Sequence, residues 1–375
     1  MRIALVQGTR PEIIKNFSIV AALARAGVRF EVLHTNQHRQ RKMCADVYRA
    51  MGYEWSRALP GRYSLGNAIE WLQRTFVRDG ITHVIVNGDT AASLAGALAA
   101  LYLDLGVTHV EAGLRSGDVL MREERNRIMV DSIATLLFAY TAYEERLLRA
   151  TPAVRGRIHL EGNTTVDVLH DFADAISRPP RSDRYVFVTL HRKELTDSRE
   201  RMTALLHALR RIAERRAVVF PVHPRTADAL RRYKLDRELG AIEAVDPVSP
   251  FESLALQKHA LAILTDSGCI QEEAYLLGVP CVTLRNNTER HLTVANGANV
   301  VAGFAIGPIL ASVEEACAAQ RRGWPDIYGP PGAGVRIVDR VLSEAAAAER
   351  RDPQRPRPAA PAEICAETLV GGDGL

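Results

Sequence analysis

The chain has 375 residues, of which 47% are hydrophobic and 25% charged, as is typical of a globular protein. Its net charge is only +4 and its arginines are dispersed, which excludes the concentrated basic face of a nucleic-acid-binding protein. The five cysteines form no CxxC pair, and no apolar run approaches the ~20 residues of a membrane span. We therefore expect a soluble, cytoplasmic protein with no structural disulfide, no zinc site and no membrane or nucleic-acid partner.

Short apolar runs alternate with helical patterns through the first half of the chain. Strands are predicted at 2–8, 30–36, 82–89, 107–113, 136–141 and 157–163, and helices between them include 11–26, 64–79 and 91–105. Continuous apolar strands separated by helices predict a parallel sheet covered on both faces.

Residues 177–184 (SRPPRSDR) interrupt this alternation, and we interpret them as an interdomain linker. Strands are then predicted at 185–190, 217–223, 241–247, 261–268, 280–285 and 299–303. The chain is thus expected to form two doubly wound α/β domains, 1–178 and 179–345, followed by a disordered tail rich in Ala, Arg and Pro over 346–375. In such sheets ligands bind beyond the carboxyl ends of the strands, so we expect the site in the cleft between the two domains.

Polar side chains follow the predicted strands of the first half. In GTRPEIIK (8–15), a helix N-terminus and Arg10 would favour an anion, although a capped strand-to-helix turn explains the motif equally well. The absence of GxGxxG and GxxxxGK[ST] argues against a standard dinucleotide or P-loop site. Asp89 could simply be a helix N-cap. Glu111 is harder to explain structurally, because a carboxylate that begins inside the sheet needs a raised pKa or a cationic partner such as Arg115.

The second half shows the same arrangement. His191 and His223 each follow a predicted strand, although a lone histidine is more often structural than catalytic. In LTDSGCIQEEA (264–274), an Asp-Ser-Gly turn opens a helix whose first amides could hold a diphosphate, and Glu273 could accept hydrogen bonds from ribose hydroxyls. Arg290 follows the next strand. Anion-binding loops together with several carboxylates suit a nucleotide-diphosphate sugar better than a nucleic acid or a metal.

Taken together and in chain order, these motifs resemble those of the non-hydrolysing UDP-N-acetylglucosamine 2-epimerases. The matching motifs are GTRPEIIK, NQHR, VNGDT, HVEAGLRSGD, EERNR, EGNTTVD, PVHPR, TDSGCIQEEA, GVPCVTLRNNTERH and GANVVAG. The resemblance implies an α/β, GT-B-like fold of two Rossmann-like domains with the active site in the cleft between them, and a homodimer. It also implies an isomerase without cofactor or metal, which eliminates UDP across C1–C2, leaves a 2-acetamidoglucal and re-adds UDP, so that UDP-GlcNAc and UDP-ManNAc interconvert.

The resemblance also implies roles for individual residues. The catalytic carboxylates would be Asp89, Glu111 and Glu123, and His191 would lie near the diphosphate. The implied substrate-binding residues are Arg10, Lys15, Phe251 (packing against the uracil), Ser267, Gly268, Glu273 and Arg290, and the strand-end pattern adds His223. Glu124, Arg125 and Arg127 are interpreted as the charged opening of a helix with local ion pairs.

The chain departs from the family pattern at several positions. Arg122 replaces a proline beside Glu123, Cys269 replaces a glycine, and YGPPGAG (328–334) lacks an acidic residue. Residues 37–40 (QHRQ) match a motif for an activating second UDP-GlcNAc, but Asn67 stands where an arginine is expected, so we expect this activation to be lost. Four alternatives remain: a 2-epimerase acting on a modified UDP-HexNAc, a hydrolysing epimerase that releases ManNAc and UDP, a catalytically inactive UDP-sugar-binding protein, and a glycosyltransferase. Three strand-end carboxylates argue against the last.

Overall fold

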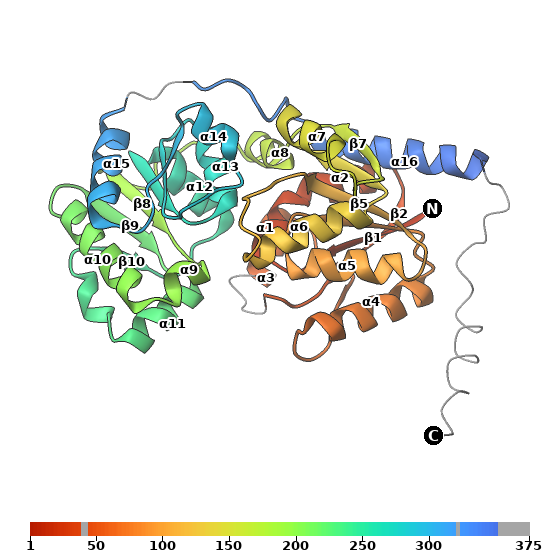
Figure 1. Cartoon of the computed structure of the whole chain (residues 1–375), viewed down its shortest axis with the longest axis horizontal. Helices are drawn as coiled ribbons and strands as arrows, with labels where there is room; N and C mark the ends of the chain where they lie inside the picture. Colours follow the sequence, from red (N-terminus) through yellow and green to blue (C-terminus); the bar gives the residue numbers. More distant parts are fainter. Residues whose placement is uncertain (39–43, 320–322, 352–375) are drawn as a thin grey trace. The chain divides into compact units, whose positions relative to one another are not determined.

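The computed structural model describes residues 1–38, 44–319 and 323–351. The chain forms two compact units, which are best followed separately (Figure 1). The first contains residues 1–114, 119–168 and those from Tyr328 onward, and the second contains 115–118 and 169–327. Within the described ranges, no helix is both long enough and apolar enough to cross a membrane.

The first unit is built on a seven-stranded parallel sheet with the strand order β3-β2-β1-β4-β5-β6-β7. Its strands are β1 (Arg2–Gln7), β2 (Arg29–His34), β3 (Arg57–Ala58), β4 (His83–Asn87), β5 (Gly106–Ala112), β6 (Leu136–Ala139) and β7 (Arg157–Leu160). All the predicted strands of this half are present. The short edge strand β3 was not predicted, because two residues carry no period-2 pattern.

Helices cover both faces of this sheet. They are α1 (Arg10–Lys15), α2 (Phe17–Arg25), α3 (Ala45–Met51), α4 (Leu65–Asp79), α5 (Ala91–Leu101), α6 (Arg122–Ile133), α7 (Ala142–Arg149), α8 (Thr164–Asp171) and α16 (Ala333–Arg351). Ala4 and Val6 of β1 join a core cluster with α4, α5 and α6, while Ile3 and Leu5, which point the other way, are also fully buried. The helix predicted over 11–26 is interrupted at Asn16, whose side chain donates to Gln7 Oε1 at 2.8 Å and accepts from Asn87 at 2.8 Å.

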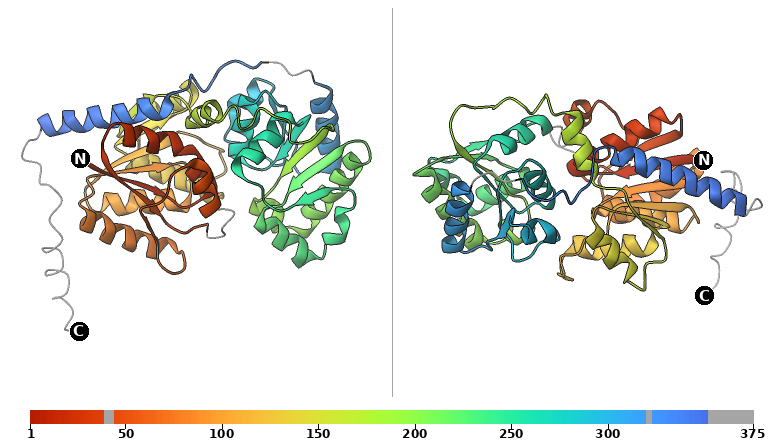
Figure 2. Two further views of the ribbon diagram at one scale, coloured as in Figure 1. Left: turned by 180° about the vertical axis from the view of Figure 1, so that it is seen from behind. Right: turned by 90° about the horizontal axis from the view of Figure 1, so that it is seen from above.

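The last described helix, α16, packs against α2 of the first unit (Figures 1 and 2). Its N-terminus is held by Asp167 of α8, whose carboxylate accepts from the amides of Gly332 (2.6 Å), Ala333 (3.1 Å) and Gly334 (2.8 Å). A Cβ on Gly334 would lie 2.6 Å from the backbone carbonyl carbon of Ser18, so only glycine permits this approach of α16 to α2. The YGPPGAG segment therefore has a structural role as the cap of α16.

The second unit has a six-stranded parallel sheet with the order β10-β9-β8-β11-β12-β13. Its strands are β8 (Tyr185–Thr189), β9 (Ala217–Pro221), β10 (Glu243–Val245), β11 (Ala262–Thr265), β12 (Cys281–Thr283) and β13 (Asn299–Val301). Its helices are α9 (Lys193–Thr196), α10 (Arg199–Ala213), α11 (Pro224–Tyr233), α12 (Pro250–His259), α13 (Gly268–Leu276), α14 (His291–Ala295), α15 (Ile306–Ala318) and the 3₁₀ helix Asp236–Leu239.

Two separate hydrophobic clusters cover the faces of this second sheet. Val186 and Val188 of β8 pack with α10, α11 and α15, whereas Tyr185 and Phe187 pack with α12 and α13. The alternation along β8 follows the period of two of a strand buried on both faces. The predicted class, two doubly wound α/β sheets, is confirmed.

The boundaries of the compact units differ from the predicted domain limits. The chain leaves the first unit within α8, between Val168 and Leu169, and Phe172 packs against Phe251 of the second unit. It returns at Tyr328, so 328–345 belong with the first unit. The helix α16 also continues to Arg351, through the first residues of the predicted tail, and 352–375 lie outside the described residues.

Candidate active site

In each unit, some of the predicted site residues lie at the point where the strand order reverses. A doubly wound sheet opens a ligand crevice there, beyond the carboxyl ends of two adjacent strands whose connections leave in opposite directions. In the first unit these strands are β1 and β4, which Arg10 and Asp89 follow. In the second unit they are β8 and β11, which His191 and Ser267 follow. Arg10, Asp89, His191 and Ser267 thus follow strands at the positions where doubly wound sheets bind ligands.

Glu111, near the end of β5, has an unusual backbone. Its φ is +69°, and the register between β5 and β6 shifts between Val110 and Ala112, as in a β-bulge. A non-glycine residue in this region is strained by about 1–3 kcal/mol, and such strain concentrates at functional sites. The carboxylate is buried and forms an ion pair with Lys15 of α1, both side chains being only 6% exposed. Lys15 is thus a cation that pairs with Glu111. The pairing with Arg115 that closeness in sequence suggested stays a prediction.

A buried histidine–carboxylate pair supports the backbone on both sides of Glu111. His109 Nδ1 lies 2.7 Å from Asp131 Oδ1, its Nε2 lies 3.0 Å from the carbonyl oxygen of Gly88, and the Asp131 carboxylate also accepts from the Gly113 amide at 3.2 Å. His109 and Asp131 are fully buried. The end of β5 is thereby fixed to α6 and to the loop after β4.

Asp89 is held by α6. Arg127, only 1% exposed, donates to the Asp89 carboxylate and also pairs with Glu124 at 2.8 Å. The side chain of Asn126 donates to the carbonyl oxygen of Asp89 at 2.8 Å. The predicted local ion pair of Arg127 at the start of α6 is present. Its guanidinium is buried, however, and also binds a predicted catalytic carboxylate.

Glu123 is the second residue of α6 and is half-buried. The exposed Arg122 occupies the first position, where proline is favoured because its missing N–H would have no partner within the helix. The helix begins at Arg122, a position that a proline could also occupy, and Glu123 is its second residue.

Glu12, which the sequence analysis did not single out, lies beside predicted site residues of the first unit. It is 3% exposed, and its carboxylate accepts hydrogen bonds from two loops. The donors are Gly8 N (2.9 Å), Thr9 N (2.8 Å), Thr9 Oγ1 (2.9 Å), Thr90 Oγ1 (2.6 Å) and Ser93 Oγ (2.9 Å). Burial raises the pKa of Glu12, and these bonds oppose the rise. Glu12 thus connects the start of α1, which carries Arg10, to the segment that follows Asp89. Its signal in the sequence was the capping box Thr9-x-x-Glu12.

The residues around the predicted activator motif have structural partners. The Arg10 amide donates to His38 Nδ1 at 3.3 Å, and Gln37 Oε1 accepts from the Ala92 amide at 3.0 Å. Asn67 is exposed in the first turn of α4. Arg39 and Gln40 lie outside the described residues, so the loss of activation stays a prediction.

In the second unit, His191 lies directly beyond β8 beside Asp266, which follows β11. The amides of His191 and Arg192 both donate to the Asp266 carboxylate, and the ring of His223 lies 5.2 Å from that of His191, centroid to centroid. Asp266 belongs to the LTDSG motif, but its contact with His191 could not be inferred from the sequence. The pairing of β8 with β11 brings the two residues together.

The N-terminus of α13 lies beside a cluster of buried ion pairs. Ser267 is the N-cap and Gly268 the first helical residue, and a Cβ on Gly268 would lie 2.3 Å from Glu289 Oε1. Arg290 is 4% exposed and pairs with Glu272 at 2.6 Å, while the nearby Arg285 donates to Glu289 at 2.8 Å. Arg290 therefore already has a buried counter-charge, and its predicted contact with substrate stays a prediction.

Phe251 and Glu273 lie on neighbouring helices of the second unit. The Phe251 ring, near the start of α12, packs against Phe172 with 4.4 Å between centroids. Glu273 of α13 is half-buried and accepts from Gln257 at 2.7 Å. The predicted contacts of these two residues with uracil and ribose are untested.

Three of the described cysteines are unsuited to thiolate chemistry. Burial raises the pKa of Cys44 to about 11 and that of Cys281 to about 12, and it also raises the pKa of Cys317. In the part of the chain that the structure describes, no group of three or more His, Cys, Asp or Glu side chains is arranged to hold a metal ion.

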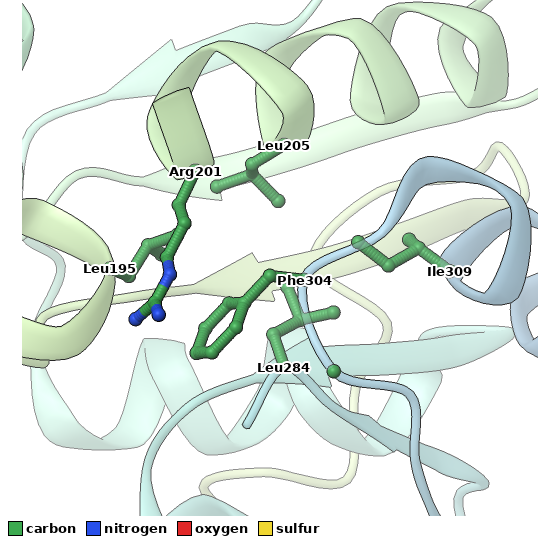
Figure 3. Close-up of a pocket in the computed structure, with 7 residues that line it drawn as sticks. Leu195, Arg201, Leu205, Leu284, Phe304 and Ile309 are labelled. Carbon is green, nitrogen blue, oxygen red and sulfur yellow. The ribbon is translucent and has the colours of Figure 1, made fainter. Parts of the chain in front are cut away.

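A small depression in the second unit is lined by none of the predicted site residues (Figure 3). Its empty volume is about 150 Å³, and the guanidinium of Arg201 lies 4.4 Å from the centroid of the Phe304 ring. Its other lining residues are Leu195, Leu205, Leu284, Gly303 and Ile309.

Comparison with known proteins agrees with the class that this fold and these residues define, an α/β enzyme built from two doubly wound sheets. The family model described as UDP-N-acetylglucosamine 2-epimerase matches residues 21–342. The chain is 35% identical to the UDP-N-acetylglucosamine 2-epimerase of Methanocaldococcus jannaschii over 370 residues, which covers 92% of this chain and 99% of the relative. The chain belongs to the UDP-N-acetylglucosamine 2-epimerase family, and the predicted resemblance is confirmed.

The solved structures agree with this assignment. The Methanocaldococcus jannaschii enzyme in complex with UDP-GlcNAc and UDP superimposes with a TM-score of 0.87 at 35% identity, covering 92% of this chain and 100% of that one. This likeness confirms the predicted GT-B-like fold. A further relative, a UDP-2,3-diacetamido-2,3-dideoxy-D-glucuronate 2-epimerase of Pseudomonas aeruginosa, is 32% identical over 352 residues, with 90% of this chain and 99% of the relative covered.

Proposed function

We propose that this chain is an isomerase that interconverts UDP-GlcNAc and UDP-ManNAc by eliminating and re-adding UDP. The observation that carries the proposal is Glu111, a buried carboxylate held at a strand end with a φ of +69° and paired with Lys15. The family likeness supports the substrate class, because a relative at 35% identity is named a UDP-N-acetylglucosamine 2-epimerase.

In the proposed reaction, the first unit handles the C2 proton. The C2–H of the sugar has no adjacent carbonyl to acidify it, so a carboxylate must remove the proton while the bond from C1 to UDP breaks. We assign this proton transfer to Glu111, Asp89 and Glu123. Two carboxylates on opposite sides of C2 would let one take a proton and another return it to the other face.

The second unit handles the leaving group. UDP departs with the electron pair of the C1–O bond, and fixed positive charge and amide dipoles stabilise the developing negative charge. We assign this role to His191 and to the first amides of α13, which follow Ser267 and Gly268. Phe251, Glu273, Arg290 and His223 are proposed to bind the remainder of the nucleotide, and Arg10 and Lys15 to complete the basic side of the first unit.

Proton NMR of UDP-GlcNAc with the enzyme in deuterated water tests this proposal. We expect both UDP-HexNAc epimers to appear, with deuterium at C2. Epimers that interconvert without deuterium at C2 would contradict the elimination, and stoichiometric UDP with free N-acetylmannosamine would show the hydrolysing reaction instead.

Glu111→Gln should lower kcat by about 10²–10⁴-fold while UDP still binds in calorimetry; full activity in this variant would remove Glu111 from the chemistry.

A second candidate substrate is a modified UDP-HexNAc. The relative that acts on a diacetamido uronate sugar nucleotide covers 90% of this chain, so family membership does not distinguish substituents at C3 and C6. Comparing kcat/KM for UDP-GlcNAc and for UDP-2,3-diacetamido-2,3-dideoxy-glucuronate decides between the two. The homodimer and the cytoplasmic location stay predictions; sedimentation of the purified chain tests the first.

A further inference from the structure

Asp266 contacts His191 through both the backbone and the ring. Its carboxylate accepts from the His191 amide at 2.9 and 3.1 Å and from the Arg192 amide at 2.8 Å. The His191 ring nitrogen Nδ1 lies 3.3 Å from Asp266 Oδ1. The pairing of β8 with β11, with Thr189 opposite Thr265, brings the two residues together because each lies just beyond its strand.

The two side chains differ in their access to water. The Asp266 side chain is 1% exposed, whereas that of His191 is 34% exposed. Burial raises the pKa of Asp266, and the amides of Arg192 and His191 oppose that rise. A buried carboxylate beside a half-exposed imidazole is an arrangement that orients the ring and stabilises its protonated form.

Other charged and titratable groups also face this pair. His223 lies with its ring centroid 5.2 Å from that of His191, and Arg225 donates from its guanidinium to the His191 carbonyl oxygen at 2.9 Å. Arg192 and Arg285 act electrostatically on Asp266. All four groups are, or can become, positively charged. They therefore disfavour protonation of the His191 ring. Glu289 pairs with Arg285 at 2.8 Å and with Arg192 at 3.6 Å, and Asp266 is the carboxylate beside the His191 ring itself.

We propose that Asp266 is a positioning residue for His191: its carboxylate accepts the Nδ1–H of the ring and leaves Nε2 as the nitrogen that gains and loses the proton. In the neutral ring this fixes the Nδ1–H tautomer, and in the charged ring it stabilises the imidazolium. The use of that charge rests on the proposed function, in which His191 faces the departing diphosphate. No covalent step is involved.

NMR of the full chain labelled with ¹⁵N-histidine tests the geometry without any substrate, and His191→Gln assigns the His191 signals. We expect the neutral His191 ring in the wild type to carry its proton on Nδ1. We also expect Asp266→Asn to lower the titration midpoint of His191 by roughly 1–3 pH units, because an adjacent opposite charge is lost. A ring protonated on Nε2, or an unchanged midpoint in a folded Asp266→Asn variant, would overturn the proposal; the tautomer is read in the wild type and so does not depend on the variant folding.

Asp197→Asn is the matched control. This aspartate follows β8 in the sequence, as His191 does, but its side chain is 59% exposed. It should leave the His191 signals unchanged, and an equal shift there would mean that the effect is general rather than due to Asp266.

The pH profile of epimerisation separates a positioning role from a structural one. In Asp266→Asn the alkaline limb of kcat should move to lower pH by the same amount as the His191 midpoint, so that lowering the pH restores part of the rate. A merely structural role would reduce kcat equally at every pH and would overturn the proposal. Failure of the wild type to epimerise would refute the proposed function, whereas the tautomer and midpoint measurements test Asp266 independently.

Discussion

Glu111 shows how a single residue can combine strain and charge at a predicted site. Its left-handed backbone is unfavourable by about 1–3 kcal/mol, so surrounding contacts must hold it there. The ion pair with Lys15 is one such contact, and the His109–Asp131 pair fixes the adjacent backbone. The backbone at the strand end therefore adopts a conformation that is locally unfavourable but places this carboxylate beside Lys15.

The Lys15–Glu111 pair should therefore be strongly coupled. Replacing one partner of a buried ion pair leaves the other charge poorly compensated, at about 3–5 kcal/mol, whereas replacing both with uncharged residues of similar size is far less destabilising. We expect Lys15→Met to reduce the free energy of unfolding by that amount, and the double variant Lys15→Met/Glu111→Gln to recover most of it. A double-mutant cycle from urea unfolding measures the coupling. Additive effects of the two substitutions would show that the pair is not coupled.

Two buried histidines of the first unit should make its stability depend on pH. Burial lowers the pKa of His34 to about 4 and that of His83 to about 4, below the ordinary value of 6.5. The unfolded chain therefore binds these protons first, so stability is complete above pH 6.5 and falls as the pH drops from 6.5 towards 4. Each histidine contributes a slope of up to about 1.4 kcal/mol per pH unit.

His83→Gln should reduce this slope, because glutamine does not titrate and can still bond to Thr108, which now lies 2.7 Å from His83 Nε2. Urea unfolding at several pH values between 7.5 and 4.5 gives the slope for each variant. His207→Gln, at an exposed position of α10, is the control and should not change it. An unchanged slope in His83→Gln would mean that His83 binds its proton equally well in the folded and unfolded chain.

At the scale of elements, the attachment of α16 depends on one carboxylate. Asp167 accepts from three consecutive amides at the start of α16, the donors that a helix cannot satisfy internally. It does so from α8, whose sequence lies far from α16, so the cap joins two distant parts of the chain. Arg336 adds a bond to the carbonyl oxygen of Glu161 at 2.8 Å, just before α8.

Asp167→Ala should lower the stability of the first unit by about 0.5–2 kcal/mol, the usual effect of removing a cap. Hydrogen exchange should accelerate first in the initial turns of α16. Asp171→Ala is the matched control, because this aspartate is exposed at the end of the same helix α8. Equal effects of the two substitutions would show that Asp167 acts through α8 rather than as the cap of α16.

At the scale of the whole molecule, the sequence predicted what is local and repetitive. Alternating apolar runs predicted every strand except β3, and strand ends predicted where Asp89, Glu111 and His191 would lie. The sequence did not reveal which side chains meet. Lys15 reaches Glu111 across 96 positions, and Asp266 reaches His191 across 75, because sheet order and not sequence distance brings them together. For the same reason the return of the chain to the first unit at Tyr328 could not be inferred from composition.

That return suggests a last prediction about the two units. The helix α16 contributes Ala333, Ile337, Val338 and Val341 to the buried core, each 0–1% exposed. Fully burying one large aliphatic side chain is worth about 1.5–3 kcal/mol, so a chain that ends at Ile327 would lose several such contributions from the first unit alone. We expect hydrogen exchange to rise in α2, on which α16 packs, and to stay unchanged in the second sheet.

Hydrogen exchange with mass spectrometry on the full chain and on the chain ending at Ile327 makes this comparison. Ile337→Ala in the full chain is the milder counterpart, with an expected loss of about 2–5 kcal/mol confined to the first unit.

The three tryptophans permit a second readout, since Trp55 and Trp71 lie in the first unit and Trp324 in the second. In the chain ending at Ile327, a variant that keeps only Trp71 should show unfolding of the first unit at lower denaturant than in the full chain. A variant that keeps only Trp324 should show an unchanged transition of the second unit. A shift of both transitions by the same amount would show that the two units unfold as one cooperative body, and that α16 stabilises the whole chain rather than the unit it joins.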